Sequence, residues 1–242
     1  MKNLFIYNPS RNKGEDKSEE PVTYLSYKIT ERKEDVWLGI LGCISDHFLP
    51  DFVDIFKEQY PDFWTDKPVK DPFTAYYETE IGKIGMALNF GLKDSTSNIV
   101  KLQNILIQAK GPSDVLGEHS QNYDFRKRYQ SVKAKYDFLL DKARKCVQGD
   151  LVFFEYGGDL SISSDIANNL SYRFPGKYIV VAYKKGNVSN ISIRGKNVRK
   201  ILENVLKEVS GSGGGHEDAV GARISLEDLG KFREVFEKEM RK

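Results

Sequence analysis

A cluster of glycines followed by a histidine is the part of the sequence whose residue types could do chemistry. It lies within residues 211–224 and contains Gly213, Gly214, Gly215 and His216. Glycine lets backbone N–H groups approach a ligand closely, and a histidine side chain can donate to the same anion. This composition is typical of a loop that holds a phosphate, and the apolar run after it suits the start of a helix. Flexible connections are also rich in glycine, so the composition alone leaves both interpretations open.

A second candidate is the pair Asp46 and His47, which follows a strongly apolar stretch over residues 36–44. A helix that is apolar on nearly all sides is buried, so we expect the pair at the end of a buried helix. A carboxylate and an imidazole at that place could cap backbone groups or bind a metal ion. The residues alone favour capping.

Residues 183–200 contain basic side chains with no acidic residue among them. A patch of one charge sign attracts the phosphates of nucleic acid. The segment includes Arg194, at the end of a predicted strand. The other candidate contacts to a nucleic-acid backbone are Lys184, Lys185, Lys196 and Arg199.

The glycine stretch belongs to a segment with the pattern of a compact α/β domain, which begins after Gly149 and Asp150. Continuous apolar runs predict buried strands, and an alternating run predicts a half-buried one. The predicted strands are 151–156, 178–183 and 188–194, and the predicted helices are 161–174, 197–208 and one after Ser225.

The first half of the chain reads as one strand followed by helices. The strand is predicted over residues 3–7 and the helices over 22–29, 34–48, 51–60, 73–91 and 96–109. Apolar residues spaced by three and four then predict a long connecting helix over 122–148. The predicted domains are therefore 1–118, a connecting helix within 119–149, and 150–242.

Composition excludes several classes of function. The 242 residues carry 37 basic and 35 acidic side chains, a net charge of +2, so bulk charge provides no attraction for nucleic acid. The two cysteines, Cys43 and Cys146, argue against a disulfide framework or a cysteine metal site. No apolar run is long enough to span a membrane, and we expect a cytoplasmic protein.

The C-terminal segment resembles the DHH-associated domain of the DHH phosphoesterase superfamily. The specific part is the string Gly-Gly-Gly-His-x-x-Ala-x-Gly over residues 213–221, with Val220 where alanine is common. The resemblance covers about residues 150–242. It implies that the phosphate of a nucleotide or nucleic acid is held by Gly213, Gly214, Gly215 and His216, with Arg194 as the helper.

Residues 1–118 resemble the last third of the catalytic domain of RecJ-like nucleases. The similarity runs from residues 4–9 through 22–28 to 38–46. It implies that Asp46 corresponds to the last metal-binding aspartate of that family, which bridges two manganese ions. The family's upstream aspartate, Asp-x-Asp pair and Asp-His-His triplet do not precede this stretch. The resemblance therefore implies an α/β chain with a partial DHH-type domain, a connecting helix and a DHH-associated domain with a mixed sheet.

The resemblance implies a protein that binds the phosphates of single-stranded nucleic acid. In this interpretation the chain is the C-terminal half or subunit of a RecJ-like phosphoesterase or exonuclease, inactive until a second chain supplies the DHH motifs. Manganese or magnesium would then bind only in the completed site. One alternative is a non-catalytic RecJ-like scaffold that associates with replication or repair proteins. A second alternative is a relative of oligoribonucleases or small-nucleotide phosphatases.

Overall fold

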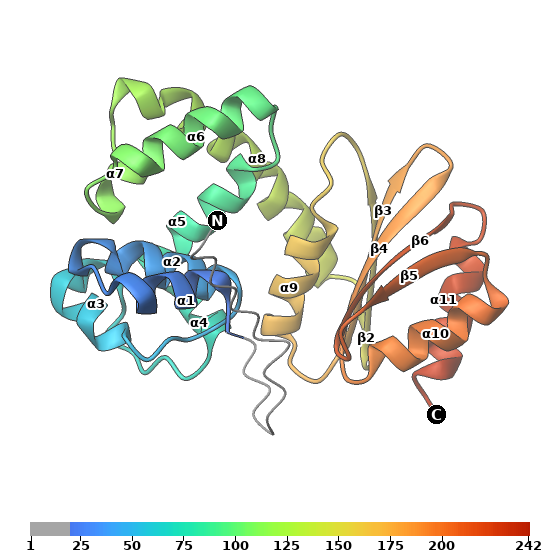
Figure 1. The fold of residues 1–242 in the computed structure, drawn as a ribbon. Coiled ribbons are helices and arrows are strands. Elements are labelled where there is room, and N and C mark those ends of the chain that lie inside the picture. The colour runs from blue at the N-terminus through green and yellow to red at the C-terminus, as the bar shows by residue number, and fades with distance from the viewer. Residues whose placement is uncertain (1–19) are drawn as a thin grey trace, which may run out of the picture. The chain divides into compact units, whose positions relative to one another are not determined.

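The computed structural model describes residues 20–242, and the predicted strand over residues 3–7 lies outside this range. The chain divides into two compact units, one ending at Ser131 and one comprising Val132–Lys242 (Figure 1). The long helix α8 (Tyr123–Arg144) crosses this division. Among the described residues, no helix is both long and apolar enough to cross a lipid bilayer.

The first unit is helical throughout its described part. Its α-helices, besides the first part of α8, are α1 (Val22–Thr30), α2 (Val36–Ser45), α3 (Val53–Gln59), α4 (Pro72–Glu78), α5 (Glu80–Gly91), α6 (Thr96–Gln108) and α7 (Pro112–Leu116). As its apolar composition predicts, α2 is buried on most sides and lies in the core of this unit, with Trp37, Ile40 and Ile44 at most 1% exposed.

The segment predicted as one helix over residues 73–91 is two helices, α4 and α5, separated at Thr79. The backbone of Thr79 is extended there, and its side chain bonds both helices. Its hydroxyl donates to the Ala75 carbonyl at 2.6 Å and accepts from the Gly82 N–H at 3.0 Å. Helix periodicity does not show such a break, because both helices bury apolar residues on a similar spacing.

The second unit is an α/β domain built on one mixed sheet of six strands, in the order β1-β2-β3-β4-β6-β5. Only β2 and β3 pair in parallel, and they are connected through α9 (Ser163–Arg173). The strands are β1 (Val147–Gln148), β2 (Leu151–Gly157), β3 (Tyr178–Lys185), β4 (Val188–Arg194), β5 (Gly211–Gly215) and β6 (Ala219–Ser225). The predicted fold class, α/β with a mixed sheet, is confirmed.

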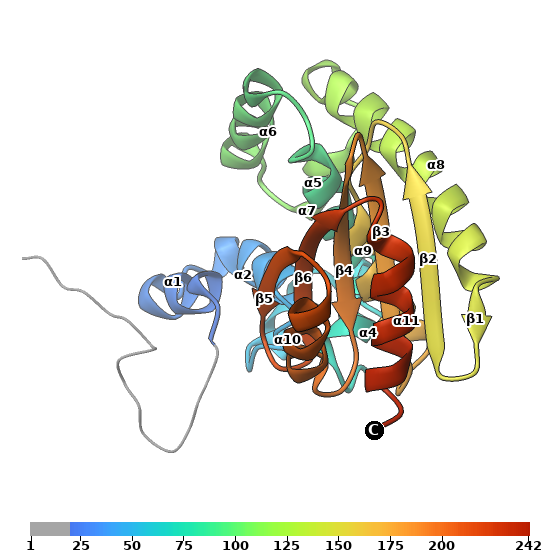
Figure 2. The same ribbon diagram turned by 90° about the vertical axis from the view of Figure 1, so that its right-hand side faces the viewer.

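Helices cover the two faces of this sheet differently. Helices α10 (Val198–Glu208) and α11 (Leu229–Glu239) lie together on one face (Figure 2) and share a core with apolar residues of β2, β3, β4 and β6. Helix α9 packs on β3 and β4 on the other face. The side chains of β5 and β6 on the α9 face are exposed or half-buried. This uncovered part of the sheet is where the glycines lie.

The long helix ends earlier than its apolar pattern predicts. Helix α8 stops at Arg144, and Val147 and Gln148 pair with β2 as the short strand β1. Gly149, with φ of +56°, makes the tight turn between the two strands. A hairpin therefore occupies the last residues of the segment predicted as a helix.

The buried position of Cys43 on α2 predicts its reactivity. Burial raises the pKa of the Cys43 thiol to about 12, and the negative charges of Asp46 and Asp51 add to the effect. Because the thiolate is the reactive form, we expect Cys43 to resist a disulfide reagent at about pH 8 in the native protein and to react on unfolding. The variant Cys146→Ser isolates this thiol for measurement by absorbance. Rapid labelling of that variant in its native state would contradict the buried position of α2.

Candidate functional site

The glycine stretch forms a hairpin at the edge of the sheet. Strand β5 pairs antiparallel with β6, with Gly214 opposite Gly221. The His216 N–H donates to the Ala219 carbonyl at 2.9 Å and closes the turn. The predicted helix after the glycines is wrong. Buried residues alternate with exposed or half-buried ones along β6, which is the pattern of a strand with one covered face.

Three of the glycines are required by the packing of the hairpin itself. A Cβ on Gly211 would lie 2.7 Å from the Arg223 carbonyl oxygen, and one on Gly213 would lie 2.7 Å from that of Gly221. Gly215 has φ of +146°, a conformation that other residues rarely adopt. These alternate positions of β5 must therefore be glycine for structural reasons.

Gly214 and Gly221 are different, because the fold leaves space for a side chain at both positions. A Cβ on Gly214 would meet no atom within 4 Å, and one on Gly221 would lie 3.7 Å from its nearest neighbour, an ordinary contact. Both residues are exposed and pair directly with each other. We call this side-chain-free surface the glycine floor.

Polar side chains of β4 lie beside the glycine floor and are held by α9. Ser192 is in register with Gly221, and its hydroxyl lies 3.0 Å from that of Ser163. Two residues further on, Arg194 Nε donates to the Asn168 Oδ1 atom at 2.7 Å. The Arg194 guanidinium also donates to the Ile193 carbonyl at 2.8 Å, so its position is well defined.

The turn of the hairpin is tied to the start of α10. The Asp218 carboxylate accepts the Asn197 N–H at 2.8 Å, and the Glu217 carbonyl accepts the Arg199 N–H at 3.1 Å. These contacts use donors that a helix N-terminus would otherwise offer to an anion. His216, which is exposed, precedes this anchored turn.

The predicted basic patch is divided between different surfaces. Lys184 belongs to the α10 side of the sheet and pairs with Glu155 at 3.2 Å. Arg199 pairs with Glu203 on α10, also at 3.2 Å. Lys185 and Lys196 are exposed, at the end of β3 and after β4. A contact of these four residues with nucleic acid stays a prediction.

Arg223 is a candidate that the sequence reasoning missed. It lies on β6 two residues after Gly221, so both point to the same face of the sheet. Its side chain is exposed and, within residues 20–242, has no ion pair or hydrogen bond. The signal available in the sequence was the alternation along residues 219–225, once that segment is recognised as a strand.

A known domain pattern matches the part of the chain that forms the six-stranded sheet. The DHHA1 domain pattern matches residues 146–242, a range that contains all six strands of the sheet. We refer to residues 146–242, which match this pattern, as the DHHA1 domain. No curated protein matches the sequence.

Solved structures show the same fold over most of the chain. Magnesium-bound RecJ from Thermus thermophilus is 11% identical, with a TM-score of 0.58 over 89% of this chain and 36% of RecJ. A manganese-bound exonuclease RecJ is 11% identical, with a TM-score of 0.56 over 88% of this chain and 57% of that protein. The described chain thus has the fold of a RecJ segment, outside the DHHA1 domain as well as within it. It spans between a third and three fifths of these relatives.

Asp46 belongs to the first unit and not to the DHHA1 domain. It follows the last residue of α2, is exposed, and its N–H bonds to the Cys43 carbonyl at 3.1 Å. The ring of the next residue, His47, stacks on Phe73 with centroids 4.3 Å apart. In the described part of the chain, no three histidine, cysteine, aspartate or glutamate side chains gather as a metal site would require. The residues described here do not fit a manganese or magnesium centre.

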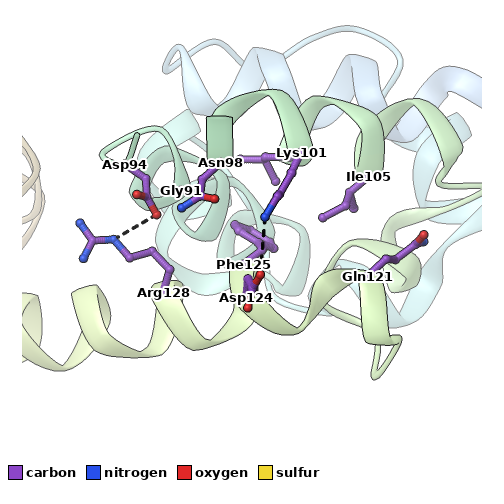
Figure 3. Close-up of a pocket in the computed structure, with 10 residues that line it drawn as sticks. Gly91, Asp94, Asn98, Lys101, Ile105, Gln121, Asp124, Phe125 and Arg128 are labelled. Atoms are coloured by element: carbon purple, nitrogen blue, oxygen red, sulfur yellow. Dashed lines mark ion pairs between the residues drawn. The ribbon is translucent and has the colours of Figure 1, made fainter. Parts of the chain in front are cut away.

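The first unit also contains a cavity of about 30 Å³ between α6 and α8 (Figure 3). Two ion pairs cross it, Arg128 with Asp94 at 3.5 Å and Lys101 with Asp124 at 3.7 Å. The volume accommodates about one or two water molecules and is too small for a nucleotide. These ion pairs link α8 to α6 and to the segment that precedes α6, and we assign the cavity no ligand.

The different surroundings of two adjacent glycines predict opposite effects on stability. Gly213→Ala should lower the free energy of unfolding by about 1–3 kcal/mol, because the new methyl group overlaps the Gly221 carbonyl and Leu202 of α10. Gly214→Ala should leave it unchanged or raise it by up to about 1 kcal/mol, because an open site gains from a less flexible unfolded chain. Denaturant unfolding measures both. Equal losses in the two variants would contradict the described register of β5.

Proposed function

We propose that the DHHA1 domain of this chain binds single-stranded nucleic acid by holding a backbone phosphate at the glycine floor. The observation that carries the proposal is the exposed pair Gly214 and Gly221, where the fold leaves room for side chains that the sequence does not supply. Absence of side chains allows a ligand to come close to the backbone. Packing explains Gly211, Gly213 and Gly215, but it does not explain these two residues.

The edge of the sheet provides donors for such a phosphate. Within residues 20–242, β5 is an edge strand, so alternate N–H groups of its backbone face away from β6. The bond from His216 to Ala219 sets the alternation and places the outward N–H groups on Gly213 and Gly215. Backbone donors next to a side-chain-free surface are a common means of binding phosphate.

Charge close to the floor supports an anionic ligand. Arg194 lies on the same face of the sheet, in register with Ala219, and its hydrogen bonds to Asn168 and Ile193 fix the guanidinium. A positioned guanidinium loses little freedom on binding a phosphate. The exposed His216 side chain at the end of β5 can donate to the same group.

A side chain on the floor tests this site directly. Gly214→Val should preserve the fold, because valine suits a strand, yet it should weaken binding of a single-stranded oligonucleotide by about tenfold or more. Fluorescence anisotropy at low salt measures the affinity. Gly230→Val on α11, another glycine with open space around it, is the matched control. Binding that survives Gly214→Val unchanged would overturn the proposal.

The charged groups beside the floor give an independent test. The double variant Arg194→Ala/His216→Ala should bind the same oligonucleotide more weakly and with a smaller dependence on salt, because fewer counterions are released when fewer phosphates are neutralised. Circular dichroism must show that the DHHA1 domain remains folded, since Arg194 also bonds Asn168. An unchanged affinity and salt dependence in a folded variant would remove both residues from the site.

We propose further that any hydrolysis by this protein depends on metal ligands from beyond the described residues. The RecJ fold favours this proposal, with Asp46 as the contribution of this chain. Manganese alone should then leave the unfolding midpoint of the isolated chain unchanged, because an ion that is not bound cannot stabilise it.

Manganese-dependent nuclease activity should appear on addition of a chain with the DHH motifs and be lost in Asp46→Asn. Activity insensitive to Asp46→Asn would exclude this aspartate as a ligand. If no such chain confers activity, a binding scaffold in a replication or repair complex is the remaining proposal.

A further inference from the structure

We infer that Arg223 is a second phosphate contact, which makes the site select a nucleic-acid chain over a single nucleotide or free phosphate. The inference rests on the proposed function, because it extends the phosphate site at the glycine floor. It concerns a residue outside the glycine-histidine string.

The register of the sheet places the two arginines on one face at opposite ends of the floor. Arg194 on β4 is opposite Ala219 on β6, and Arg223 lies four residues further along β6. An even separation along a strand returns the side chain to the same face. The row between them holds Gly214, Gly221 and Ser192, so no large side chain separates the two arginines.

The spacing of the arginines determines which ligand can use both. Four residues of a strand span about 13 Å. A single phosphate can therefore reach only one end of the floor, whereas a chain of several nucleotides can lie across it and reach both ends. The ligand class is an oligonucleotide or a longer single strand.

No contact within the described residues gives the Arg223 guanidinium a structural role. In the described part of the chain its guanidinium makes no ion pair or hydrogen bond, and its neighbours in register are Asn190 and Ser212, which are neutral. By contrast, Arg194 bonds Asn168, and Arg233 on α11 pairs with Glu237 at 2.8 Å. The Arg223 side chain is thus free to bind an anion without breaking an existing contact.

The test compares ligands of different length. The variant Arg223→Gln should bind a single-stranded oligonucleotide of about 10 residues several-fold more weakly, and the slope of log affinity against log salt should fall by about 0.7, the loss of one phosphate contact. Its affinity for inorganic phosphate should equal that of the unchanged protein. Lys238→Gln is the matched control, because it removes one exposed positive charge from α11 on the other side of the sheet.

The outcomes separate this inference from the proposed function. If Gly214→Val abolishes oligonucleotide binding while Arg223→Gln leaves affinity and salt slope unchanged, only the role of Arg223 is overturned. Equal losses in Arg223→Gln and Lys238→Gln would also overturn it, since bulk charge would then account for the effect. If Gly214→Val has no effect on binding, the proposed function itself fails.

Discussion

The pairing of β5 with β6 at the sheet edge is the constraint on which the candidate site depends. Gly211, Gly213 and Gly215 allow β5 to lie against β6 and α10, which fixes the register of the hairpin. Because the side-chain period of a strand is two, a slip by one residue would turn Gly214 to the covered face. The three glycines that packing requires thus fix the register, and the register places Gly214 on the exposed face.

Contacts with two helices make this edge a defined surface. Asp218 and Glu217 connect the hairpin turn to the start of α10, and α9 holds Ser192 and Arg194 of β4 from the other face. A site built on strands and helices keeps its geometry better than one on a loop. The same contacts show why glycine content alone is a poor guide to flexibility, since this stretch lies in an ordered ladder.

The first unit has a defined fold, but its described residues form no cluster that could hold a metal ion. Helix α2 is buried as its composition requires, and Asp46 is exposed at its end. One exposed carboxylate does not hold a divalent cation, which needs several oxygen ligands. The likeness to RecJ concerns the fold of this unit, and the binding proposal rests on the DHHA1 domain alone.

The sequence by itself located three of the strands of the DHHA1 domain and predicted a phosphate site, which stays a prediction. Apolar runs located β2, β3 and β4, and the Gly-Gly-Gly-His string indicated phosphate binding, because these signals are local along the chain. Only the tertiary structure decided that the segment after His216 is a strand, that Lys184 lies on the α10 side of the sheet, and that Arg223 shares a face with Arg194. Pairing between distant strands sets these features. The alternation along residues 219–225 is short and follows a run of glycines, so it is a weak signal until the pairing with β4 and β5 is known. Charge in a sequence does not reveal which face of a sheet will carry it.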